Sequence, residues 1–163
     1  MKLTFLIIFY LCAFIIFWAM IGYPVSLRVL KKIFKNRTLE KNFSYEPTVT
    51  VMVVAHNEEK IIKEKLENII KIEYPKNKIE FLIASDHSTD KTNDIVREFI
   101  LNHSDYNIRL FEVKERKGKT NAQNEAQKTV KSEILVMTDA NSMFKPNSVR
   151  ELVATFTAPD ISY

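Results

Sequence analysis

The sequence predicts an α/β domain with a largely parallel, doubly wound sheet, preceded by one transmembrane helix. Two observations carry this prediction. An apolar segment without charges opens the chain, and short apolar segments alternate with helical ones over the rest of it. The 163 residues are 46% hydrophobic and 27% charged. That composition suffices for one core and one appended segment.

Residues 1–23 form the predicted transmembrane helix, because no charge interrupts residues 3–23 and this length crosses roughly 30 Å of hydrocarbon. A cleaved signal is the competing interpretation, but its apolar core is usually about 7–15 residues and precedes a small-x-small site, which is missing here. Lys2 precedes the span, whereas six basic residues follow in 24–41. The positive-inside rule therefore predicts a single span of the lipid bilayer, with the N-terminus outside and the domain in the cytoplasm.

Residues 24–47 are predicted to be a basic juxtamembrane linker. Seven of the 24 Lys and Arg residues lie before residue 42, which leaves 17 against 19 of the 20 acidic residues in 42–163. This balance argues against nucleic acid as a partner. Cys12, the single cysteine, lies in the apolar segment, so neither a disulfide nor a cysteine-based metal site is available.

Residues 48–163 read as alternating strands and helices. Apolar, β-branched runs predict strands at 49–55, 79–85, 108–113 and 133–139. Helical periodicity predicts helices at 58–71, 91–101, 120–130 and 147–156, with Asn57 and Asp90 suitable as N-caps of the first two. Such nearly continuous apolar strands are typical of a parallel sheet that is covered on both faces.

Polar residues follow each predicted strand. They are grouped at 56–59, 86–90, 115–120 and 139–141. The carboxyl ends of parallel strands lie at one edge of the sheet, where ligands bind in this architecture. Acids and lysines at such an edge indicate a phosphorylated ligand with a divalent ion, because Mg²⁺ and Mn²⁺ prefer oxygen ligands.

Two familiar phosphate-binding motifs are incomplete. Gly22 and Gly118 are the only glycines, so the G-x-G-x-x-G fingerprint of a dinucleotide-binding site is absent. Gly118-Lys119-Thr120 matches the end of a P-loop, yet Val113 stands where that motif requires its first glycine. A P-loop ATPase is therefore disfavoured.

Four segments in order resemble the successive motifs of family 2 glycosyltransferases, inverting enzymes with the GT-A fold. They are VTVMVVAHNEE, FLIASDHSTDKT, ERKGKTNAQNEA and ILVMTDANSMFKPNSVREL, and the resemblance covers about residues 47–160. The synthases of poly-N-acetylglucosamine, hyaluronan and cellulose resemble this chain also through their membrane anchors. The resemblance implies a GT-A, Rossmann-like domain that binds a nucleotide sugar, with UDP as the expected nucleotide.

The resemblance also implies roles for individual residues. A group lining the nucleotide pocket comprises Ala55, His56, Asn57 and Glu58, with Glu58 near the ribose or base. Asp86 corresponds to the acid that contacts the uracil ring, and Lys119 approaches the nucleotide and its diphosphate. Ser85 stands where many members have a further Asp, and His87 replaces a common glycine.

Asp139 and Asn141 occupy the outer positions of the family's D-x-D motif. The resemblance implies that they hold Mg²⁺ or Mn²⁺ on the diphosphate, although the amide of Asn141 brings no charge. The implied reaction transfers the sugar of a UDP-sugar donor to a glycan or lipid-linked acceptor. The metal and Lys119 stabilise the leaving nucleoside diphosphate while an acceptor hydroxyl attacks the anomeric carbon.

Each assignment has a structural alternative. Asn57 and Asp90 fit helix caps better than ligands, and His56 fits an ordinary loop histidine equally well. The run from Lys114 to Lys119 also fits a solvated charged surface. Asp86 and Asp139 each follow a strand, where an Asp can cap a turn.

The general base that an inverting transfer requires is not found in the sequence. In the family it belongs to an acidic motif, commonly Thr-Glu-Asp, downstream of the D-x-D element. This chain has no Glu-Asp dipeptide. The Gln-x-x-Arg-Trp motif of processive members is also missing, because Trp18 is the only tryptophan. We therefore expect a domain that is truncated at its C-terminus and inactive alone. The alternative is a non-catalytic nucleotide-binding subunit that pairs with a second polypeptide carrying the acceptor half.

Overall fold

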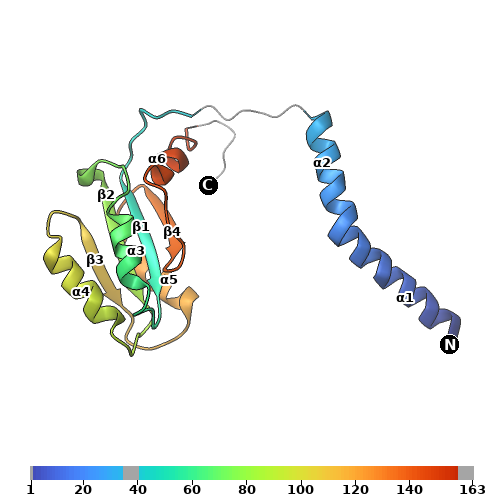
Figure 1. Cartoon of the computed structure of the whole chain (residues 1–163), viewed down its shortest axis with the longest axis horizontal. Coiled ribbons are helices and arrows are strands. Elements are labelled where there is room, and N and C mark those ends of the chain that lie inside the picture. The colour runs from blue at the N-terminus through green and yellow to red at the C-terminus, as the bar shows by residue number, and fades with distance from the viewer. Residues whose placement is uncertain (1, 35–40, 158–163) are drawn as a thin grey trace. The chain divides into compact units, whose positions relative to one another are not determined.

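The computed structural model describes residues 2–34 and 41–157 (Figure 1). The chain divides into two units, residues 1–39 and residues 40–163. The division separates the apolar N-terminal segment from the predicted α/β domain.

The first unit is a continuous helix from Lys2 to Ile33. It consists of α1 (Lys2–Phe17), the π-helical turn η1 (Trp18–Gly22) and α2 (Tyr23–Ile33). No residue of this helix is buried, and by length and composition it can cross a membrane. The helix continues past residue 23, so residues 24–33 of the predicted linker are helical, while residues 35–40 lie outside the described part of the chain.

The second unit contains a parallel sheet of four strands in the order β3-β2-β1-β4. The strands are β1 (Val49–Ala55), β2 (Ile79–Ser85), β3 (Ile108–Glu112) and β4 (Ile134–Asp139). β1 and β2 are almost completely buried, as their uninterrupted apolar runs predict. The predicted parallel α/β fold is confirmed, and β3 and β4 are the edge strands of the described sheet.

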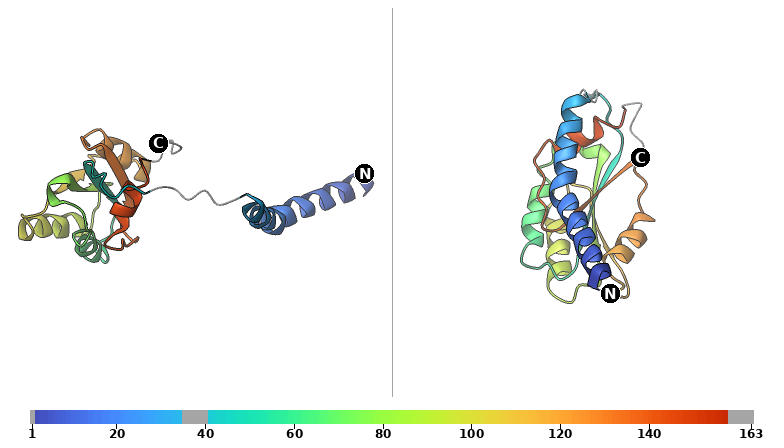
Figure 2. Two further views of the ribbon diagram at one scale, coloured as in Figure 1. Left: turned by 90° about the horizontal axis from the view of Figure 1, so that it is seen from above. Right: turned by 90° about the vertical axis from the view of Figure 1, so that its right-hand side faces the viewer.

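Helices cover both faces of the sheet. They are α3 (Ile62–Ile69), α4 (Thr92–Asn102), α5 (Lys119–Gln127) and α6 (Ser148–Val153), with a short 3₁₀ turn, η2 (Lys76–Lys78), before β2. Alternate side chains of β1 and β2 pack on α3, α4 and α6 in one apolar cluster, and the intervening ones pack on α5 in a second. Figure 2 shows α5 on the opposite side of the sheet from α3 and α4.

The first domain helix begins four residues later than its periodicity predicts. The carbonyl of Glu58 accepts the N–H groups of Ile61 and Ile62, so residues 58–61 form a turn that leads into α3. The preceding residue, Asn57, has a φ of 54°, in the left-handed region where a right-handed helix cannot continue. The prediction that Asn57 caps this helix is therefore wrong, because its left-handed backbone and the turn at residues 58–61 separate it from α3.

Candidate functional site

The carboxyl ends of the strands surround a cavity of about 170 Å³. Its lining comprises Val54, Ala55, His56, Glu58, Asp86, Lys119, Asp139, Ala140 and Asn141. These residues come from β1, β4, the loops after β1, β2 and β4, and the first residue of α5. Every predicted site residue except Asn57 lines this cavity.

Asp86 lies deepest among the acids of the cavity, at 3% exposure. Its N–H donates to the carbonyl of Ala55 at 2.9 Å, so the parallel pairing of β1 and β2 fixes its backbone. Its Oδ1 is buried and accepts no hydrogen bond within the described residues. A buried oxygen without a donor is costly, which makes Asp86 ready to accept an N–H group from a ligand.

His56 is oriented by the loop after β2, which carries Asp86. Its Nδ1 lies 2.7 Å from the carbonyl oxygen of Asp86. A carbonyl oxygen only accepts, so Nδ1 carries the proton and Nε2 is the acceptor of the neutral ring. His56 is thus a fixed wall of the cavity as well as a loop residue.

Asn57 supports the cavity from outside. Its Oδ1 accepts the N–H of Thr89 at 2.8 Å, and its own N–H donates to the hydroxyl of Ser88 at 3.2 Å. Two further bonds between the same segments join the N–H of Glu58 to the hydroxyl of Thr92 at 2.8 Å and the N–H of Glu59 to the carboxylate of Asp90 at 3.1 Å. The loops after β1 and β2 are therefore cross-braced, which holds Glu58 and Asp86 at fixed positions.

Asp90 combines this bracing with a hydrogen bond at the start of α4, although the N-cap position predicted for it is held by Lys91. Its Oδ1 accepts the N–H of Thr92, the first residue of α4, at 2.9 Å. Burial acts to raise the pKa of Asp90, but the hydrogen bonds from the hydroxyl and N–H of Thr92 and from the N–H of Glu59 together lower it below its usual value. Asp90 is a structural acid, as its residue type and position indicate.

Asp139 and Lys119 form the exposed side of the cavity. Lys119 Nζ donates to Asp139 Oδ1 at 2.5 Å, and the two side chains are 54% and 50% exposed. Lys119 begins α5 directly after Gly118, whose φ of 89° is strained for any other residue. The ammonium group of Lys119 beside Asp139 shows that this carboxylate pairs with a cation at the cavity.

The oxygen atoms of Asp139 and Asn141 are suitable ligands for a hard divalent cation. In the described residues, no three His, Cys, Asp or Glu side chains are grouped to hold a metal by themselves. An ion here would therefore be held by one carboxylate, one amide oxygen and oxygens from a ligand or water. Mg²⁺ is commonly bound through few protein ligands together with substrate phosphates.

Sequence reasoning missed Lys65 and Asn68 of α3. Lys65 is completely buried, and its Nζ donates to the hydroxyl of Thr138 at 3.2 Å and to the carbonyl of Ser142. Asn68 exchanges two hydrogen bonds with the backbone of Phe144, at 2.9 and 2.8 Å. The signal was available, since Lys65 stands within the apolar stripe of Ile62, Leu66 and Ile69.

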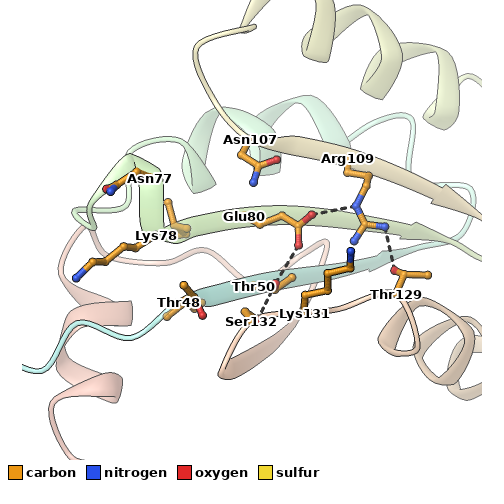
Figure 3. Close-up of a pocket in the computed structure, with 12 residues that line it drawn as sticks. Thr48, Thr50, Asn77, Lys78, Glu80, Asn107, Arg109, Thr129, Lys131 and Ser132 are labelled. Carbon is orange, nitrogen blue, oxygen red and sulfur yellow. Dashed lines mark hydrogen bonds and ion pairs between the residues drawn. The ribbon is translucent and has the colours of Figure 1, made fainter.

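Another cavity, of about 510 Å³, lies at the opposite ends of the strands (Figure 3). Its central polar groups bond to one another: Glu80 accepts from Thr50 at 3.0 Å and from Arg109 at 2.9 Å, and Arg109 donates to Thr129 at 2.9 Å. None of the predicted site residues lines it. Because these groups already have partners, this cavity is a weaker candidate for chemistry than the smaller one.

A parallel sheet with a polar crevice at the carboxyl ends of its strands defines an α/β ligand-binding domain. The chain belongs to glycosyl transferase family 2, because the family model matches residues 50–163. It is 30% identical to the probable glycosyltransferase YdaM of Bacillus subtilis over 114 residues, which are 69% of this chain and 27% of YdaM.

Two solved structures are also similar. The mannosyltransferase PcManGT of Pyrobaculum calidifontis, in complex with GDP-Man and Mn²⁺, has a TM-score of 0.81 and 32% identity over 91% of this chain and 44% of its own. TarS of S. aureus, in complex with UDP-GlcNAc, has a TM-score of 0.60 and 25% identity over 66% of this chain and 30% of its own. The chain spans less than half the length of each of these three proteins.

Proposed function

We propose that this chain binds the nucleotide-sugar donor of a membrane-anchored glycosyltransferase, with UDP as the nucleotide and Mg²⁺ or Mn²⁺ on its diphosphate. The observation that carries the proposal is that two acids with different environments line one cavity. Asp86 is buried with an oxygen free to accept a bond, and Asp139 is exposed beside a lysine. A base and a diphosphate, as parts of one ligand, match these two environments.

The residues on the buried side bind the base and ribose. Asp86 Oδ1 accepts the imide N–H of uracil. Of the two buried acceptors without a partner in the described residues, Asp86 Oδ1 and Asn93 Oδ1, it is the one whose residue lines the cavity. Glu58, held by the bond from its N–H to Thr92, lies at the cavity wall to accept a ribose hydroxyl. Ala55 and His56 close the floor and the wall.

The residues on the exposed side bind the diphosphate. Asp139 and Asn141 would hold the divalent ion, and Lys119, at the start of α5, would donate to a phosphate oxygen. The bound ion supplies electrophilic stabilisation of the negative charge that develops on the leaving diphosphate. Lys119 stabilises the same charge through a charge-assisted hydrogen bond.

Membership of the family supports a proposal for the wider reaction. The donor sugar, of the hexose or N-acetylhexosamine class, passes with inversion to a glycan or lipid-linked acceptor during polysaccharide biosynthesis. We assign the general base to none of the described residues, and in the alternative proposal a second polypeptide carries the acceptor half. The N-terminal helix anchors the domain in the bilayer, with basic α2 residues Arg28, Lys31 and Lys32 on the cytoplasmic side.

Calorimetric titration of the full chain in detergent micelles tests the donor site. UDP, GDP and ATP are each titrated with Mn²⁺ and with EDTA. We expect UDP to bind in the presence of Mn²⁺ and to bind more weakly with EDTA. Stronger binding of GDP would replace uracil by guanine, preference for ATP would favour an ATPase, and absence of binding by all three would refute the donor site.

A further inference from the structure

Lys65 is the one buried lysine or arginine among residues 2–34 and 41–157, and its burial is complete. No carboxylate lies within ion-pair distance of its ammonium group in that part of the chain, although Asp139 is near enough to act on its charge. Desolvation outweighs this attraction and lowers the pKa of Lys65 from 10.5 to about 8. An apolar side chain of similar length would avoid that cost, so the contacts made by the ammonium need an explanation.

Those contacts are all with the segment that carries the proposed metal ligands. The ammonium donates to the hydroxyl of Thr138, one residue before Asp139, and to the carbonyl of Ser142, one residue after Asn141. It also lies 4.8 Å from the centre of the Phe144 ring. Lys65 therefore holds the segment at both ends of the stretch from Asp139 to Asn141.

The rest of α3 extends the same attachment. One turn after Lys65, Asn68 pairs with both backbone groups of Phe144. Beyond the helix, the N–H of Glu73 donates to the carbonyl of Pro146 at 2.8 Å. The loop after β4 thus follows α3 rather than the sheet, and its position depends on side chains of that helix.

We propose that Lys65 is a positioning residue, which holds the loop after β4 so that Asp139 and Asn141 meet the same divalent ion. This inference rests on the proposed donor site. Lys65 touches neither ion nor nucleotide, and it acts by fixing the backbone on both sides of the two ligands. Metal affinity is sensitive to such outer partners, whose loss typically weakens it 10- to 100-fold.

The sign of the effect separates positioning from charge. Replacing Lys65 by methionine removes a positive charge near the ion, and Coulomb's law alone then predicts tighter binding of Mn²⁺. Loss of positioning predicts weaker binding. A structural role without positioning predicts a lower melting temperature with unchanged affinity in the folded fraction.

The test uses the full chain in micelles with Lys65→Met and with Lys63→Met as its matched control. Lys63 is an exposed residue at the start of the same helix, so its replacement makes the same change in charge. For Lys65→Met we expect at least a tenfold weakening of Mn²⁺-dependent UDP binding, with less than a threefold change for uridine. Lys63→Met should bind both as wild type does. Unchanged or tighter Mn²⁺-dependent binding by Lys65→Met would overturn the proposal.

Two further measurements keep the test decisive. Thr138→Val removes one acceptor of the ammonium and nearly preserves shape, so it should act in the same direction, by about threefold, even if Lys65→Met does not fold. Amide hydrogen exchange of Ser142 and Phe144 needs no ligand and should accelerate at least tenfold in Lys65→Met or, to a lesser degree, in Thr138→Val. If wild type binds no nucleotide, the donor site fails while the exchange result still decides whether Lys65 holds the loop; unchanged exchange overturns that role.

Discussion

The two acids of the cavity lie at the carboxyl ends of β2 and β4, the two strands that flank β1, but they have opposite environments. Asp86 is 3% exposed with an unpartnered oxygen, whereas the side chain of Asp139 is 50% exposed and paired with Lys119. The supports differ as well: the Asp86 side is braced by a second loop, and the Asp139 side is held by a helix. A shared position at strand ends therefore does not fix the role of an acid. Burial and partners decide whether it suits an N–H donor or a cation.

The largest expected effect is on the exposed side. Asp139→Asn should weaken Mn²⁺-dependent UDP binding on the order of 100-fold, because an amide lacks the charge that favours a hard cation. Binding of uridine should change little. Calorimetry with UDP and with uridine measures both, and equal losses for the two ligands would contradict the division into a metal side and a base side.

The buried side should respond to a different ligand. Asp86→Ala is expected to weaken uridine and UDP alike by about tenfold, since both lose one hydrogen bond to a carboxylate. The melting temperature should not fall, because the lost oxygen has no partner within the described domain. A lower melting temperature with unchanged uridine binding would make Asp86 a structural acid.

Two substitutions of Asn57, on the buried side, test its side-chain hydrogen bond and its backbone conformation separately. Asn57→Gly removes the bond to Thr89 but keeps the left-handed backbone, and should lower the free energy of unfolding by about 1 kcal/mol. Asn57→Ala should cost roughly 1–2 kcal/mol more, because alanine is strained at positive φ. Urea unfolding of both variants measures this, and equal stabilities would show that the backbone is not constrained.

A further expected effect concerns the support of the exposed side. The pKa of Lys65 is about 8 in the folded chain and 10.5 in the unfolded chain. Between these two pH values the unfolded chain therefore binds more protons than the folded one. Stability should therefore rise as pH increases from 8 to 10. The range ends there because the pKa of Tyr74, raised by burial to about 12, causes stability to fall above pH 10. Thermal unfolding of Lys65→Met should lack the rise that Lys63→Met retains.

The strands were predictable from sequence because their apolar runs are bounded by polar residues. β1 and β2 match their predicted limits, and β3 and β4 differ by one residue each. Helix starts were less predictable. Glu58 reads as helical by periodicity, but hydrogen bonds to the distant residues Thr92 and Asp90 hold this stretch as a turn.

The cavity could be assembled from sequence because strand ends determine which loops meet. The role of Asn57 could not, since it depends on a partner loop about 30 residues away. Lys65 was missed for a similar reason, since its partners Thr138 and Ser142 lie 73 and 77 residues further along the chain. A charged residue within an apolar helical stripe is usually placed at the edge of that stripe, and only the path of the loop after β4 explains its complete burial.

The two edges of the sheet differ in their resistance to self-association. The β3 edge carries Arg109 and Glu112, which are engaged in ion pairs with Glu80 and Arg97. The β4 edge has no charge from Ile134 to Thr138, and Met137 is 56% exposed. Charged residues protect an edge strand from pairing with another chain, and apolar ones do not. When β4 is left uncovered, aggregation of this domain should therefore begin at β4, and an added strand on that side would raise its solubility.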